Sequence, residues 1–159
     1  MKQVDRNEFF MSIAIEEAKK AAAIGEVPVG AVIVWKNKVI AKAFNTRETE
    51  KNALCHAEIK AINKACEKLG GWRLFECELF VTLEPCPMCT GAIINSRIKT
   101  LVFGASDPKA GAVVSRARLF DMGFNHVPEI IGGVMNDECA ELLSSFFSEL
   151  RQKKKPLGK

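Results

Sequence analysis

Three side chains that bind metals constrain the fold of this chain more than any other feature. Cys86 and Cys89 belong to the run Pro85-Cys-Pro-Met-Cys89, and His56 lies well before them in the sequence. One imidazole and two thiolates suit Zn²⁺ and fill three of its four tetrahedral positions. A fourth position left open can hold a water molecule and lower its pKa towards neutrality. We therefore predict one catalytic zinc ion per chain, bound by His56, Cys86 and Cys89.

Glu58 completes this set as a proton carrier beside the metal, because a carboxylate near a zinc-bound water can move protons without being a ligand. Inside a helix, His56 and Glu58 would point in nearly opposite directions, so they converge only at a helix start. Cys86 and Cys89 share one helix face, and Pro87 between them is tolerated in a first helical turn. The spacing predicts two helix N-termini that face one metal, where the positive end of the helix dipole favours thiolates.

Two other interpretations of the cysteine pair remain open. A lone C-x-x-C can be redox-active, or it can be half of a closed structural zinc site. A closed site needs a fourth ligand, and Cys55 is a poor candidate because its side chain diverges from that of neighbouring His56. The remaining three cysteines, Cys66, Cys77 and Cys139, have no ligand-like spacing. They and Cys55 are expected to be reduced, mostly buried thiols. The pattern favours the open catalytic site.

Hydrophobic periodicity predicts one α/β domain over residues 1–159. A first amphipathic helix carries Asp5 and Glu8 in capping-box positions. Strands at 29–35 and 39–44 form a hairpin, and Asn136 provides the N-cap of a last helix. Between them we expect helices at 56–70 and 87–96, strands at 78–83 and 99–104, a short helix at 116–122 and an edge strand at 127–131. Strands that alternate with helices predict a three-layer α/β/α arrangement.

The net charge is +4, and positive residues become denser from about residue 151: Arg151, Lys153, Lys154, Lys155 and Lys159. This basic tail has two interpretations of equal weight, contact with nucleic-acid phosphates or a helix end that complements its own dipole. We find no segment apolar enough to span a membrane, and we expect a cytoplasmic protein.

The pair H-x-E and P-C-x-x-C is also the signature of zinc-dependent nucleobase deaminases. Together with His56-Ala-Glu58, several segments resemble the bacterial tRNA-specific adenosine deaminases over nearly the whole chain: Glu26-Val-Pro-Val-Gly-Ala-Val-Ile-Val34, Val81-Thr-Leu-Glu-Pro-Cys-Pro-Met-Cys89, Ser96-Arg-Ile98, Val102-Phe-Gly-Ala105, Asp107-Pro-Lys109, Phe124-Asn-His126 and Leu142-Leu-Ser-Ser-Phe-Phe147. The resemblance implies a cytidine deaminase-like fold with a five-stranded mixed sheet and a homodimer. It also implies conversion of adenosine to inosine at the wobble position of a tRNA anticodon.

The resemblance assigns roles to particular positions. It matches His56, Cys86 and Cys89 to the zinc ligands and Glu58 to the proton shuttle. Further matches are Asn45 to the group that hydrogen-bonds the flipped base, Pro28 and Val29 to the base pocket, and Asp107 and Lys109 to a loop that meets the RNA. Each has a simpler reading: Asn45 as a turn residue, Pro28 and Val29 as core, Lys109 as a solvated side chain. His126 is predicted to be a hydrogen-bonded structural residue.

The chain also departs from the family pattern. Cys55 replaces the usual alanine before His56, Lys51-Asn-Ala-Leu54 replaces the common loop, and the segment 113–119 lacks the usual glycine-serine-leucine pattern. This last segment borders the substrate entrance in the family. Alternatives that keep the chemistry are therefore a deaminase of free guanine or another small purine or nucleoside, and a cytidine or cytosine deaminase. An inactive zinc-stabilised RNA-binding module is disfavoured by Glu58, which a structural zinc does not need.

Overall fold

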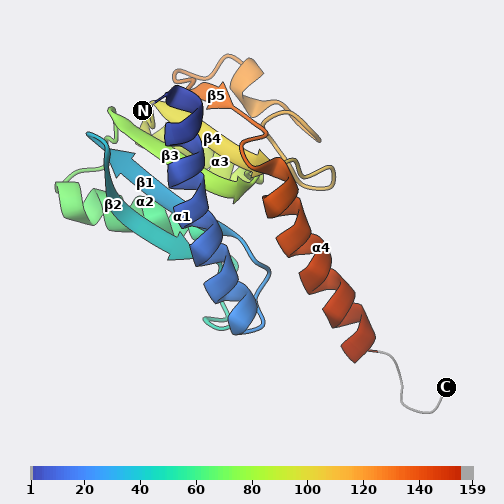
Figure 1. Cartoon of the computed structure of the whole chain (residues 1–159). Coiled ribbons are helices and arrows are strands. Elements are labelled where there is room, and N and C mark those ends of the chain that lie inside the picture. The colour runs from blue at the N-terminus through green and yellow to red at the C-terminus, as the bar shows by residue number, and fades with distance from the viewer. Residues whose placement is uncertain (1, 155–159) are drawn as a thin grey trace, which may run out of the picture.

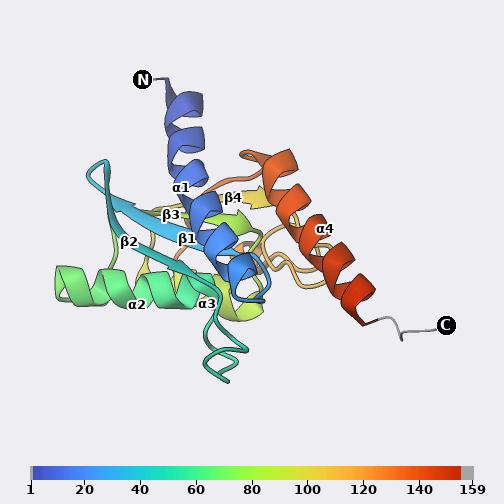
Figure 2. The same ribbon diagram turned by 60° about the horizontal axis from the view of Figure 1, so that its bottom comes forward.

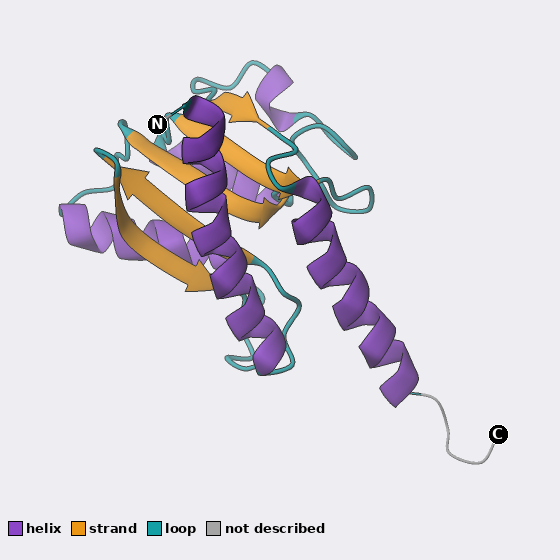
Figure 3. Ribbon diagram, in the orientation of Figure 1, coloured by secondary structure: helices purple, strands orange, loops and turns teal. Residues whose placement is uncertain are grey.

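The computed structural model describes residues 2–154 and contains a five-stranded mixed sheet with helices around it (Figures 1 and 3). The strand order is β2-β1-β3-β4-β5. β1 pairs antiparallel with β2 and β3, whereas β3, β4 and β5 are parallel. The elements are α1 (Gln3–Ala23), β1 (Gly30–Trp35), β2 (Lys38–Phe44), α2 (Ala57–Leu69), β3 (Cys77–Leu83), α3 (Pro87–Ser96), β4 (Thr100–Ala105), the 3₁₀-helix η1 (Leu119–Asp121), β5 (Glu129–Ile131) and α4 (Asn136–Lys153).

Helices cover both faces of the sheet, which confirms the predicted three-layer α/β/α fold. α1 and α4 lie on one face and α2 and α3 on the other (Figures 1 and 2). Alternate residues of β1 enter the two cores, as the period of a strand requires. Ile33 packs in the cluster that contains Ala61 of α2, and Val32 packs in the cluster that contains Met11 of α1. The sheet is therefore buried on both sides.

The predicted hairpin is present, with a tighter turn than expected. Lys36 and Asn37 have φ values of 51° and 63°, so both central residues are left-handed, as in a type I′ turn. β2 consequently begins at Lys38. The register shifts between Ile33 and Val34, which places a bulge in the hairpin.

Two predicted helix caps are wrong. α1 begins at Gln3 after Lys2, so Asp5 lies in its first turn and no side chain caps the helix. α4 begins at Asn136 itself, after Met135 with a φ of 54°. In both helices the acidic residues of the first turn still complement the dipole. Exposed helix ends can donate their free N–H groups to water, which removes the need for a side-chain cap.

Smaller differences concern the irregular segments. The predicted helix at 116–122 is a single 3₁₀ turn, Leu119–Asp121. The predicted edge strand forms only after Pro128, as β5, which is the outer strand of the sheet. Along residues 2–154, no helix is both long and apolar enough to cross a membrane.

Candidate metal centre and substrate pocket

Two helix starts bring the predicted ligands together. His56 is the residue immediately before α2, and Cys86 holds the same position before α3, with Pro87 in the first turn. Cys89 is buried in the first turn of α3. β3 ends at Leu83, so the cysteine turn follows directly from the carboxyl end of a central strand. This is the edge at which open α/β sheets bind ligands.

The three donor atoms have the spacing of a zinc site. The Sγ atoms of Cys86 and Cys89 each lie 3.6 Å from Nδ1 of His56. A sulfur and a nitrogen bound to one tetrahedral zinc, at about 2.3 and 2.0–2.1 Å, are separated by roughly 3.6 Å. All ligand atoms of the group lie within 4.8 Å of one another, and among residues 2–154 the group consists of these three residues. The donor set therefore fits zinc with one position left for a non-protein ligand.

The charge on the two sulfurs supports this reading. A hydrogen bond from the Cys89 thiol, and to a smaller extent one with His56, lowers the pKa of Cys86 to about 4. The same contact raises the pKa of Cys89, because two adjacent sulfurs resist ionising together. A divalent cation between them would replace the shared proton and stabilise both thiolates.

Glu58 lies in the first turn of α2 and is only 4% exposed. Burial raises the pKa of Glu58 to about 7, and the charge of nearby Cys86 adds to the effect. A carboxyl group with a pKa near neutrality can both accept and return a proton at physiological pH. Its position beside the donor set matches the predicted proton carrier.

A cavity of about 210 Å³ opens above this group. Of the predicted site residues, Val29, Asn45, His56, Glu58, Cys86 and Asp107 line it. Pro28 is buried beside Val29 without being part of the lining, and Lys109 is exposed two residues beyond Asp107. Further lining residues were not predicted from the sequence: Val27, Arg47, Ala57, Leu83, Glu84 and Ala110.

Asn45 connects the hairpin to the pocket and is 7% exposed. Its Nδ2 donates to the carbonyl of Val27 at 3.2 Å, and its Oδ1 accepts from the N–H of Arg47 at 3.2 Å. An amide group has two N–H donors and two lone pairs on its oxygen. One donor and one lone pair of Asn45 therefore remain for a ligand, so the turn reading and the binding reading of this residue are compatible.

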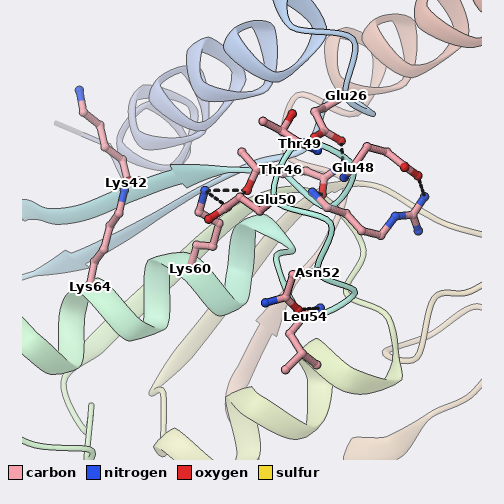
Figure 4. A network of polar contacts seen from close by, with 12 residues as sticks. Glu26, Lys42, Thr46, Glu48, Thr49, Glu50, Asn52, Leu54, Lys60 and Lys64 are labelled. Atoms are coloured by element: carbon pink, nitrogen blue, oxygen red, sulfur yellow. Dashed lines mark hydrogen bonds and ion pairs between the residues drawn. The ribbon is translucent and has the colours of Figure 1, made fainter.

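The loop between Asn45 and His56 is fixed by a polar network (Figure 4). The buried carboxylate of Glu26 accepts from the N–H groups of Glu48 and Thr49, at 3.1 and 2.6 Å. At the other side, Lys60 of α2 donates to Thr46 at 2.8 Å and pairs with Glu50 at 3.1 Å. Arg47, whose side chain is half exposed, lines the pocket from this hydrogen-bonded loop.

The other histidine and the remaining cysteines lie outside the metal group. His126 donates through Nε2 to the carbonyl of Ile98 at 2.7 Å, so the hydrogen bond that was predicted for it is present. Cys77 and Cys139 are buried free thiols, and Cys55 and Cys66 are half-buried free thiols. Burial raises the pKa of Cys77 to about 11, so this thiol stays protonated at neutral pH.

Comparison with known proteins agrees with this chemistry. A family model described as MafB19-like deaminase matches residues 4–151. The tRNA-specific adenosine deaminase of Bacillus subtilis is 50% identical over 155 residues, which cover 97% of this chain and 96% of that protein. A structure from a study of A-to-I editing by tRNA:A34 deaminases at the wobble position of transfer RNA has a TM-score of 0.83 and 45% identity. The match covers 85% of this chain and 99% of that one.

A guanine deaminase from Bacillus subtilis is also similar, with 34% identity, a TM-score of 0.62, and coverage of 78% of this chain and 71% of that one. The fold is therefore shared with a protein described as a guanine deaminase. The tRNA-specific relatives match at higher identity and over more of both chains. Together with the family model, these matches show that the chain belongs to the family of tRNA-specific adenosine deaminases.

Proposed function

We propose that the chain is a tRNA adenosine deaminase, a hydrolase that converts adenosine to inosine at the wobble position of an anticodon. It acts as one catalytic domain over residues 1–159, with a basic tail from about residue 151. The observation that carries the proposed chemistry is the buried Glu58 carboxyl beside three donors that fit zinc. The proposed substrate is supported by the 50% identity to a tRNA-specific adenosine deaminase.

In this proposal one zinc ion per chain is held by His56, Cys86 and Cys89. When bound, zinc supplies Lewis-acid activation of a water molecule. Glu58 takes a proton from the attacking water and returns protons to the ring nitrogen and to the amino group of C6. Water is added, the C6–N bond breaks and ammonia leaves, so adenosine becomes inosine. This use of Glu58 distinguishes the enzyme from a zinc-stabilised binding module.

The pocket walls are assigned to the substrate base and its neighbours. Val29, which follows the buried Pro28 in the chain, offers an apolar surface to a purine face, and Asn45 offers its free donor and acceptor to the base edge. An adenine inside a paired stem cannot reach this depth, whereas an extruded base of an anticodon loop can. Asp107, Lys109 and the basic tail are assigned to the flanking RNA. Of that tail, Lys155 and Lys159 lie outside the described residues.

We further propose a homodimer and a cytoplasmic location. A groove between α2 and α3 is lined in part by Ile59, Ile62 and Trp72. Trp72 is 51% exposed and nearby Phe75 is 58% exposed, which supports a partner surface on this face. Light scattering of the purified protein tests the dimer. The cytoplasmic location follows from a tRNA substrate.

The decisive experiment incubates the purified protein with total tRNA and maps inosine in the products. Competition kinetics then compare an anticodon stem-loop with free adenosine, guanine and cytidine. We expect deamination of the stem-loop to be far faster than that of any free base or nucleoside. Preference for guanine would overturn the proposed substrate and favour the free-purine alternative.

A further inference from the structure

Glu84 is a buried carboxylate for which the proposed reaction has no direct use. It lies between the end of β3 and Cys86 and is 2% exposed. Its Oε1 accepts from the N–H of Asp107 at 3.0 Å and from the hydroxyl of Ser115. Its Oε2 accepts from three successive N–H groups, those of Val113, Val114 and Ser115, at 3.1, 2.8 and 3.0 Å. Five donors thus surround one carboxylate.

The segment 107–115 wraps around this carboxylate. The N–H of Ala112 donates to the carbonyl of Pro85 at 2.9 Å, which adds a backbone connection beside the side-chain contacts. A Cβ atom at Gly111 would lie 2.4 Å from Cδ of Glu84, so the glycine leaves the space that the carboxylate fills. The carboxylate and the loop therefore fit each other closely.

The same loop forms one wall of the pocket. Asp107 and Ala110 line the cavity together with Glu58, and Glu84 is itself one of the lining residues. The backbone N–H of Asp107 also donates a hydrogen bond to Glu84. We propose that Glu84 is a positioning residue that fixes the Asp107–Ala110 wall of the pocket and thereby sets substrate binding, without contacting the metal or the reacting atoms. The identity of the substrate whose binding Glu84 affects rests on the proposed function.

The nature of the donors explains why the altered segment 113–119 is compatible with the fold. Val113 and Val114 are held through their backbone N–H groups, which any residue except proline provides. A change of their side chains leaves these contacts in place. The Ser115 hydroxyl is the one side-chain donor among the five.

Glu84→Gln tests the proposal with little change in shape. An amide group at the Oε2 position would face three N–H donors, so the amide nitrogen must take the Oε1 position. There the Ser115 hydroxyl can turn and accept, but the N–H of Asp107 loses its acceptor. We expect faster hydrogen exchange of the Asp107 amide, full zinc content, a KM for the stem-loop raised by about tenfold and a kcat within about threefold of the unmodified protein.

Glu76→Gln is the matched control, because Glu76 is an exposed carboxylate just before β3. If Glu84→Gln does not fold, Ser115→Ala removes a single contact and should raise KM by about threefold with zinc retained. Loss of zinc in a folded variant would assign Glu84 to the metal turn and overturn the proposal. Unchanged KM with unchanged exchange at Asp107 would overturn it as well.

The two proposals fail in different ways. If the unmodified protein does not deaminate the stem-loop, the proposed substrate is wrong. KM is then measured on the purine that the protein does deaminate, and exchange at Asp107 still reports whether Glu84 holds the pocket wall.

Discussion

Glu58→Gln removes the proposed proton carrier and keeps the shape of the side chain. Glu58 is 4% exposed, and burial raises its pKa to about 7, so near neutral pH the carboxyl group is available in both protonation states. A glutamine amide at the same place neither accepts nor delivers a proton. Because Glu58 is not among the metal-binding donors, the variant should keep its zinc and its fold.

The expected loss follows from the role assigned to this group. A positioned general acid–base group contributes about 10²–10⁴-fold to a rate, which corresponds to roughly 2.7–5.4 kcal/mol. In the proposed reaction one carboxylate performs the transfers in both directions, so kcat should fall by at least this range. Glu67→Gln is the matched control, since Glu67 is an exposed carboxylate on the same helix.

The assay is single-turnover deamination of an anticodon stem-loop, with zinc measured by elemental analysis of the same samples. Single-turnover conditions separate chemistry from product release. A Glu58→Gln protein that keeps its zinc and reacts within tenfold of the unmodified protein would refute the assigned role. A variant that loses zinc would show instead that the carboxylate supports the metal.

Four further results are expected. Cys86→Ser together with Cys89→Ser should abolish zinc retention in dialysed protein, and full occupancy in this variant would contradict the ligand assignment. Asn45→Ala should lower turnover and spare the metal, measured by kinetics alongside elemental analysis, because it removes a group proposed to hold the base. Removal of residues 151–159 should reduce the salt dependence of RNA binding if the tail contacts phosphates, and an unchanged slope would show a solvated helix end. Although burial opposes it, hydrogen bonds from Thr49 and Glu48 lower the pKa of Glu26, so its ionised form contributes stability above a pH of about 4.5 that is lost as pH falls further. Glu26→Gln should flatten the acid limb of unfolding free energy against pH, and an unaltered limb would refute this.

The layers of the fold could be predicted because the periodicity of hydrophobic residues and the positions of helix-breaking residues are local signals of helices and strands. The type I′ turn at Lys36 and Asn37 and the first residue of each long helix were less predictable. Both depend on where tertiary packing extends or shortens an element, as when α1 begins at Gln3 and leaves Asp5 inside its first turn. Exposed helix ends do not require a capping side chain, so a capping pattern alone does not fix a boundary.

The residues of the site also differ in how far the sequence predicts them. His56, Cys86 and Cys89 could be predicted to meet because each belongs to a short motif at a helix start. Glu84 also lies in such a motif, yet its donors come from Asp107 and from residues up to 31 positions away. The one signal for it in the sequence is an acidic residue directly after a strongly apolar strand, which usually requires a buried partner.

Two buried carboxylates hold two loops that line the pocket. Glu26 binds backbone N–H groups of the loop that carries Arg47, and Glu84 binds those of the loop that carries Asp107. Since both anchors act mainly on the backbone, the side chains that face the substrate can change without loss of the loop geometry. Glu58 and the donors that fit zinc belong to the starts of α2 and α3. The loops and the helix starts therefore contribute different parts of the pocket lining: Arg47, Asp107 and Ala110 come from the loops, and His56, Glu58 and Cys86 come from the helix starts.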